Sequence, residues 1–139
     1  MRQRVSAAGL VTALILLVLA GCGGDSGTST ATIETISPTE AAELLNDPPA
    51  DLVVLDVRTP DEFAGGHLAD AVNLDYQAAG FADELSALDR GASYLLYCRT
   101  GNRSAQVREM MSDLGFAEVY EIAGGIVAWT GAGLAVVVP

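Results

Sequence analysis

The sequence between positions 98 and 104 is Cys98-Arg99-Thr100-Gly101-Asn102-Arg103-Ser104. An apolar run of strand character, residues 94–97, precedes it, and a helical pattern over residues 105–114 follows it. One cysteine therefore lies where a buried strand ends, and a short loop leads from it to the start of a helix. This arrangement predicts a strand–loop–helix unit with Cys98 at its centre.

The surroundings of Cys98 favour a reactive thiolate. Backbone N–H groups in such a turn and the dipole of the following helix supply partial positive charge. Arg99 and Arg103 add two full positive charges, which lower a thiol pKa from its usual value of about 8.5. The alternative interpretation is a small, unreactive core residue, but Gly101 and the two arginines argue against it.

The rest of the chain from residue 33 onward alternates strand-like and helical patterns. Strands are expected at residues 52–57, 71–74, 93–97 and 119–122, and helices at residues 37–45, 59–64, 80–88, 104–114 and 126–130. Two of the helices open with capping boxes that have proline at the first helical position, at Ser37 and Thr59. Such alternation predicts an α/β domain with a parallel sheet, and ligands of such sheets bind beyond the carboxyl ends of the strands. Cys98 and Asp56 both lie at such ends.

The charge of the chain excludes some partners. All seven basic residues are arginines, against 18 acidic residues, for a net charge of −11. Since Arg2 and Arg4 precede every acidic residue, the remainder is more acidic still. A field of this sign argues against nucleic acid as a partner. An anionic substrate would need a local basic site, and such a site can attract it because salt screens the repulsion from more distant acidic residues.

The N-terminal region is expected to lie outside the fold. Arg2 and Arg4 precede an apolar stretch that is short for a bilayer span and ends in small residues, as in a secretory signal. The segment Leu19-Ala20-Gly21-Cys22 resembles the lipobox of bacterial lipoproteins, which implies cleavage before Cys22 and lipidation of that residue. An uncleaved anchor helix and an ordinary secretory leader are the alternatives. We therefore expect a signal peptide over residues 1–21, a flexible tether over 22–32 and a globular domain over 33–139, held on the extracytoplasmic face of the cell membrane.

Four motifs make the domain resemble a single-domain rhodanese, a sulfurtransferase module. They are Leu55-Asp56-Val57-Arg58-Thr59-Pro60-Asp61-Glu62-Phe63, then Gly66-His67-Leu68, then residues 98–104, and then Ala123-Gly124-Gly125 with Trp129. The resemblance covers essentially all of residues 33–139 and implies a five-stranded parallel sheet with helices on both faces. One departure is Ala69-Asp70-Ala71, where the family commonly has Pro-Gly-Ala or similar.

The resemblance implies a chemistry. Cys98 would take a sulfane sulfur from a donor such as thiosulfate, hold it as a persulfide, and pass it to cyanide or a thiol, with no metal or organic cofactor. The resemblance also implies that the backbone amides of Arg99, Thr100, Gly101, Asn102, Arg103 and Ser104 cradle the sulfur anion. Arg99 is expected to bind the anionic donor, and Arg103 either to hold the loop or to contact the anion. Asp56, near the ligand-binding end of the sheet, and Arg58 are expected to support the site from a second layer of residues.

Other residues receive structural interpretations. Arg58 and Glu62 stand four apart at a helix start, which predicts an ion pair. Asn102 and Ser104 are candidate caps of the following helix. His67, the only histidine, is expected to be a hydrogen-bonded structural residue, because a thiolate needs no general base. Trp129 is expected in the core.

Two other function classes remain open. Cysteine-dependent phosphatases use the same strand–loop–helix unit but place five residues between cysteine and arginine, one more than the four here. A catalytically idle domain that binds a partner or senses redox state is the second alternative. With Cys22 lipidated, Cys98 has no partner in the chain for a disulfide switch.

Overall fold

A computed structural model describes residues 30–139; the leader, Cys22 and most of the expected tether lie outside the described residues. Strands and helices alternate throughout. They are β1 (Thr32–Ile36), α1 (Pro38–Asn46), β2 (Val53–Asp56), α2 (Pro60–Ala64), β3 (Val72–Asn73), α3 (Phe81–Ser86), β4 (Ser93–Tyr97), α4 (Asn102–Asp113), β5 (Glu118–Ile122) and α5 (Gly125–Gly131). Among residues 30–139, no helix has both the length and the apolar character needed to cross a bilayer.

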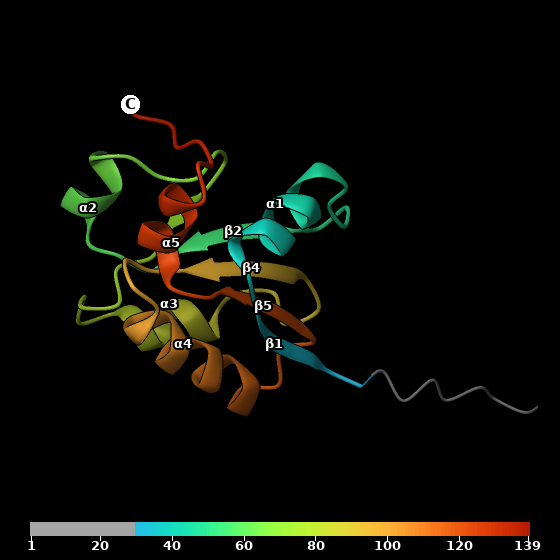
Figure 1. Ribbon diagram of the computed structural model, residues 1–139. Helices are drawn as coiled ribbons and strands as arrows, with labels where there is room; N and C mark the ends of the chain where they lie inside the picture. The colour runs from blue at the N-terminus through green and yellow to red at the C-terminus, as the bar shows by residue number, and fades with distance from the viewer. Residues whose placement is uncertain (1–29) are drawn as a thin grey trace, which may run out of the picture.

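The five strands form one parallel sheet in the order β1-β5-β4-β2-β3. Helices α1 and α5 lie on one face of the sheet and α3 and α4 on the other (Figure 1). This confirms the expected five-stranded parallel sheet covered on both faces. The edge strand β1 was not among the strands that the residue pattern indicated, although its β-branched residues suit a strand.

Strand β4 is central, and all five of its residues are buried. Because successive side chains of a strand point to opposite faces, its residues divide between two cores. Tyr94 and Leu96 pack with Cys98 in the core beneath α3 and α4, whereas Leu95 and Tyr97 pack in the core beneath α1 and α5. Trp129 lies in the second core, 5% exposed, which confirms its expected place.

The helix starts follow the predicted capping chemistry. Ser37 and Thr59 each accept a hydrogen bond from the backbone of the glutamate three residues on, and Glu40 and Glu62 each accept one from the cap residue's own amide. Proline is the first residue of both helices. The other expected elements are present, with ends that differ by one or two residues where helices and strands fray.

The turn at residues 69–71 explains the one departure from the family motifs. Asp70 has a φ of +59°, which makes it the one non-glycine residue with a positive φ in the described part of the chain. Glycine adopts this left-handed conformation without steric cost, and aspartate tolerates it better than most residues. Asp70 therefore adopts a backbone conformation that glycine would adopt more easily.

Candidate active site

Cys98 occupies the first position after the central strand and is 1% exposed. Within residues 30–139 it forms no disulfide. Its Sγ accepts a hydrogen bond from the Gly101 amide at 3.1 Å and lies 3.4 Å from the Ser104 hydroxyl. The loop thus folds back over the sulfur and aims donors at it.

These donors determine the acidity of the thiol. Burial raises the pKa of the Cys98 thiol, but hydrogen bonds from the Ser104 hydroxyl and from the amides of Ser104, Gly101 and Thr100 outweigh it. The net result is a pKa below the ordinary thiol value. Three of the six amides that the sequence suggested as a cradle therefore stabilise negative charge on the sulfur.

The start of α5 holds the loop in this orientation. The amides of Ile126 and Val127 donate to the carbonyl oxygens of Cys98 and Arg99 at 2.9 and 3.1 Å. Since the C=O and N–H of one peptide plane point in opposite directions, holding the Arg99 carbonyl against α5 turns the Thr100 amide away from that helix.

The approach of α5 to the loop requires glycine at position 125. A Cβ at Gly125 would lie 2.4 Å from the carbonyl oxygen of Cys98 and 2.6 Å from that of Arg99. Gly125 also has a φ of +60°. A side chain there would push α5 off the loop and release the carbonyls that orient its peptide planes.

Helix α4 begins without a side-chain cap, so the expected caps at Asn102 and Ser104 were wrong. Gly101 is the residue before the helix, at a φ of +99°, and no side chain caps the first amides. The physical reason is that the cysteine sulfur takes the place of a cap. Amides at the start of α4 face Sγ, and the Ser104 hydroxyl points to Sγ and to a buried carboxylate.

Arg103 holds the loop against α2. Its guanidinium donates to both oxygens of Glu62, each at 2.8 Å, in a two-pronged ion pair. The hydrogen bond from Arg103 lowers the pKa of Glu62 to about 2, with further help from Thr59. Of the two roles expected for Arg103, this geometry shows the loop-holding one.

Arg58 does not pair with Glu62, so that prediction was wrong. Arg58 lies before Thr59, the cap residue of α2, so it is not on the helix and the four-residue spacing does not bring the two side chains together. Arg58 pairs instead with Asp56, Nη2 to Oδ2 at 2.6 Å, and also donates to the Gly66 carbonyl at 2.7 Å. Asp56 is fully buried, so it acts on the site by holding Arg58.

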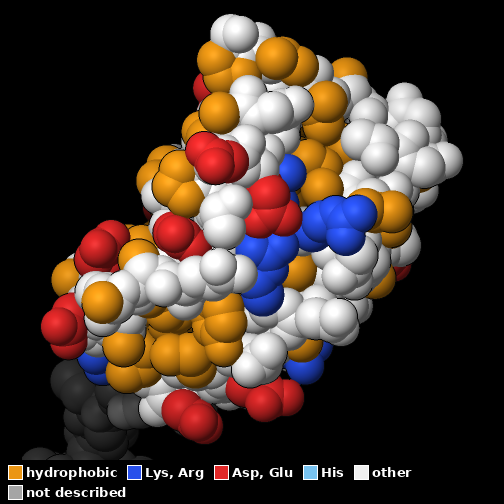
Figure 2. Space-filling model, turned by 90° about the vertical axis from the view of Figure 1, so that its left-hand side faces the viewer, with side chains coloured by type: hydrophobic (Ala, Val, Ile, Leu, Met, Phe, Trp, Pro, Cys, Tyr) orange, Lys and Arg blue, Asp and Glu red, His pale blue; other side chains and the backbone are white. Residues whose placement is uncertain are grey.

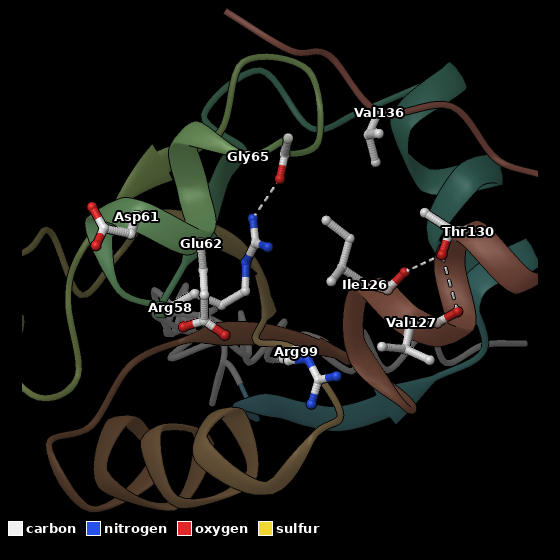
Figure 3. Close-up of a pocket in the computed structure, with 10 residues that line it drawn as sticks. Arg58, Asp61, Glu62, Gly65, Arg99, Ile126, Val127, Thr130 and Val136 are labelled. Carbon is white, nitrogen blue, oxygen red and sulfur yellow. Dashed lines mark hydrogen bonds between the residues drawn. The ribbon is translucent and has the colours of Figure 1, made fainter.

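A cavity of about 350 Å³ lies beside the loop. Figure 3 shows Asp61 and Glu62 of α2 on one side of it and Ile126, Val127 and Thr130 of α5 on the other. Arg58 and Arg99 also line it. Figure 2 shows basic side chains gathered at the centre of this face, with acidic ones around them. The cavity thus combines local positive charge with an apolar wall on an acidic molecule.

His67 has the contacts expected of a structural residue. Its ring stacks on Phe63 with centroids 3.7 Å apart, and Nδ1 lies 2.9 Å from the Phe63 carbonyl oxygen. Its backbone pairs with Val137 of the C-terminal segment. These contacts join the end of α2 to the last residues of the chain.

Sequence reasoning missed two carboxylates of the site. Glu62 was expected in a capping box and beside Arg58, not as the partner of Arg103. Glu121 was not singled out, although it is 3% exposed and accepts a hydrogen bond from Ser104. Its signal was an acidic residue between Tyr120 and Ile122, in a strand of a sheet expected to be covered by helices on both faces. Within residues 30–139, no three His, Cys, Asp or Glu side chains gather as a metal site would require.

Comparison with known proteins identifies the family of this domain. The model of the rhodanese-like domain family matches residues 37–132. A sulfurtransferase of Allochromatium vinosum is 34% identical over 89 residues, 64% of this chain and 81% of that protein. Thiosulfate sulfurtransferase GlpE of Pseudomonas putida is 36% identical over 94 residues, 68% of this chain and 82% of that protein. The crystal structure of a rhodanese-related protein from Thermoplasma volcanium superposes with a TM-score of 0.67 at 30% identity, over 76% of this chain and 99% of that one. The chain therefore belongs to the rhodanese-like domain family.

Proposed function

We propose that this protein is a sulfurtransferase that moves a sulfane sulfur from a donor such as thiosulfate to a thiophilic acceptor through a persulfide on Cys98. The observation that carries the proposal is the set of donors around Sγ: the Gly101 amide at 3.1 Å and the Ser104 hydroxyl at 3.4 Å, which stabilise the sulfur anion. The relatives named as sulfurtransferases support the same chemistry.

The first half-reaction loads the enzyme. The Cys98 thiolate attacks the outer sulfur of thiosulfate, a new S–S bond forms, and the S–S bond of the donor breaks. Sulfite leaves with the electron pair, and the negative charge now lies on the outer sulfur of the persulfide. This anion needs the same kind of inward-facing amides as the thiolate did, so one cradle serves both states.

The second half-reaction releases the sulfur. Cyanide or a cellular thiol attacks the outer sulfur of the persulfide, and Cys98 departs as the thiolate with which the cycle began. Splitting the transfer into two displacements on one nucleophile predicts ping-pong kinetics. A base, a metal or an organic cofactor is not required by either step.

The cavity suits the capture of an anionic donor. Arg99 is exposed at its edge and forms no ion pair within residues 30–139, so its guanidinium is available to a ligand. Arg58 also lines the cavity, but its charge is matched by Asp56. We therefore assign donor binding to Arg99 and the support of the cavity wall to the pair of Asp56 and Arg58.

A phosphatase is the less favoured activity because of Arg103. A phosphate-binding loop needs an arginine whose two prongs face the phosphoryl oxygens. Here both prongs of Arg103 are taken by Glu62, and the loop is one residue shorter than in those enzymes. A partner-binding or redox-sensing domain remains the second candidate, and the sulfur-transfer assay separates it from an enzyme.

The experiment is a thiosulfate–cyanide assay of the purified protein. We expect thiocyanate to form with ping-pong kinetics, and Cys98→Ser to reduce the rate to the uncatalysed level. Cys22→Ser, which removes the other cysteine, should retain the activity. Hydrolysis of an aryl phosphate without thiocyanate formation would support the phosphatase. The absence of both activities would support a binding domain.

We also propose that Cys22 carries a lipid that anchors the protein to the extracytoplasmic face of the cell membrane. The support is the sequence Leu19-Ala20-Gly21-Cys22 after a basic and then apolar leader. Residues 23–31 are small and polar, so they would serve as a tether between the membrane and the first strand.

A further inference from the structure

A buried carboxylate lies behind the cysteine. Glu121 belongs to β5 and pairs in register with Leu96 of β4, two residues before Cys98. Its neighbour on the same face of the strand, Val119, packs in the same core as Cys98. At 3% exposure, a carboxylate costs free energy unless hydrogen bonds and charge compensate it.

Each oxygen of Glu121 has its own donors. Oε2 accepts from Arg108 and from the Thr35 hydroxyl, each at 3.0 Å. Oε1 accepts from the Ser104 hydroxyl at 2.7 Å. Arg108 forms an ion pair with Oε2, and both carboxylate oxygens act as acceptors of hydrogen bonds.

The Ser104 hydroxyl therefore has one proton and faces two anions, with the Gly101 carbonyl oxygen 3.3 Å away as a third, neutral acceptor. Its oxygen lies 2.7 Å from Oε1 of Glu121 and 3.4 Å from Sγ of Cys98. A hydroxyl carries a single hydrogen and donates one strong hydrogen bond at a time. While the proton is aimed at Glu121, Sγ retains only its backbone donors.

We infer that Glu121 and the Cys98 thiolate compete for the single proton of Ser104, and that Glu121 thereby disfavours the thiolate relative to the persulfide. Glu121 acts through Ser104 and is a positioning residue. In the thiolate state, the charge on Sγ draws the Ser104 hydrogen away from Oε1. In the persulfide state, the charge lies on the outer sulfur, and Ser104 returns its hydrogen to Glu121.

Other charged residues near Cys98 are already paired, so they do not remove the competition between Glu121 and Cys98 for the Ser104 proton. Arg103 of α4 favours the thiolate, but its guanidinium is shared with Glu62. On the other side of β4, Asp56 is paired with Arg58. Glu121 differs from these carboxylates because a single hydroxyl connects it to Sγ.

The persulfide half of the inference rests on the proposed function, whereas the competition for the Ser104 proton does not. The test is therefore a titration of the free thiol, in which no sulfur donor is present. We would follow thiolate absorbance in the ultraviolet and the rate of alkylation of Cys98 against pH. A Cys22→Ser background ensures that the signal comes from Cys98 alone.

Glu121→Gln is the principal variant. It keeps the shape of the side chain, removes the negative charge and offers Ser104 an NH₂ donor, which frees the Ser104 hydrogen for Sγ. We expect the midpoint of the Cys98 titration to fall. At pH values well below the midpoint, the fraction of Cys98 present as thiolate should rise at least about threefold. Glu118→Gln is the matched control, because Glu118 lies on the same strand and bonds to Ser93, at the opposite end of β4 from Cys98. It should leave the midpoint unchanged.

Thr35→Val provides a test from a distance, on the edge strand β1. It removes one donor from Oε2 and also the hydroxyl to which Arg108 donates, while the ion pair of Arg108 with Oε2 remains. Glu121 should therefore attract the Ser104 hydrogen more strongly, and the midpoint should rise. In a Ser104→Ala background there is no shared hydrogen. Glu121→Gln should then shift the titration midpoint by less than half as much as it does when Ser104 is present, because only the direct effect of the charge remains.

The results separate the two proposals. A lower midpoint for Glu121→Gln, without a shift in Glu118→Gln, supports the inference even if no sulfur is transferred. An unchanged midpoint in folded Glu121→Gln overturns the inference. A higher midpoint also overturns it, and would indicate instead that Glu121 accepts the proton of the Cys98 thiol. If Glu121→Gln does not fold, the Thr35→Val variant decides: a titration midpoint that is unchanged or lower than in the natural protein overturns the inference.

Discussion

At the scale of single residues, the site is a sulfur atom with donors arranged around it. Cys98 Sγ meets an amide and a hydroxyl at 3.1 and 3.4 Å, and these outweigh the effect of burial on the thiol. Arg103, which was expected either to hold the loop or to contact the anion, is paired with Glu62. The charge available to a substrate is therefore that of Arg99.

Arg99→Ala tests this division of roles. We expect the KM for thiosulfate to rise several-fold and kcat to change little, because the role proposed for Arg99 is to attract the donor and not to act on Sγ. Steady-state kinetics with varied thiosulfate check it. Arg90→Ala removes the same charge at an exposed position away from the cavity and should leave KM unchanged. An equal rise in KM for both variants would mean that overall charge, not a local site, draws in the donor.

The sequence revealed single residues where the signal was local. Cys98, Gly101 and the arginines of the loop lie within six residues of one another, so a motif identifies them. Glu121 lies 23 positions beyond Cys98 and approaches it only through the register of β5 with β4. Arg58 and Glu62 illustrate the opposite error, because their spacing was interpreted as helical although Arg58 precedes the helix.

At the scale of elements, the loop is held between two short helices. The first amides of α5 fix the carbonyls of Cys98 and Arg99, and Glu62 of α2 fixes Arg103. Glu62 thus joins the start of its own helix to the active-site loop. Its low pKa makes this link dependent on pH.

Glu62→Gln should make stability less sensitive to acid. The pKa of Glu62 is about 2 in the folded protein, below the ordinary value of 4.5. A depressed carboxylate pKa stabilises the fold above the unfolded pKa, and this contribution is lost as the pH falls from about 4.5 to about 2. We expect the variant to be less stable by about 1 kcal/mol at pH 7, a value limited by solvent screening, and to approach the natural protein near pH 2.

Denaturant unfolding at pH 7, 4 and 3 measures this effect. Glu40→Gln is the matched control, because Glu40 has the same position in the capping box of α1 and makes no ion pair within residues 30–139. It should lose less stability at pH 7 than Glu62→Gln. A difference between Glu62→Gln and the natural protein that stays constant down to pH 3 would contradict the role of the ion pair.

The pattern of elements could be predicted because it depends on local chemistry. Capping boxes and apolar runs of strand length identified four strands and all five helices to within one or two residues at most ends. Strand β1 was missed because it is an edge strand in which Glu34 and Thr35 are exposed, which leaves little apolar periodicity. Strand order and pairing are set by packing between distant segments, and the residue pattern alone did not supply them.

At the scale of the whole molecule, an acidic protein presents a small basic site at one end of its sheet. The net charge is −11, yet the carboxyl ends of the strands carry the basic patch of Figure 2. Parallel strands place the cysteine loop, α2 and the start of α5 at this one end (Figure 1). The fold thereby concentrates the chemistry where a ligand has access.

The proposed lipid anchor makes a prediction about the intact protein. Metabolic labelling with a fatty acid in a bacterial host should label the natural protein and the Cys98→Ser variant, and should not label Cys22→Ser. Fractionation should find the labelled protein with membranes, and protease added to intact spheroplasts should reach it. Equal labelling of Cys22→Ser would contradict lipidation at that residue.

The most direct test of sulfur transfer by Cys98 is the intact mass of the protein after reaction with thiosulfate. In a Cys22→Ser background, the mass should rise by one sulfur atom, the added atom should map to the peptide that contains Cys98, and cyanide should remove it and form thiocyanate. A mass that stays unchanged under thiosulfate, or an added sulfur located away from Cys98, would contradict the account.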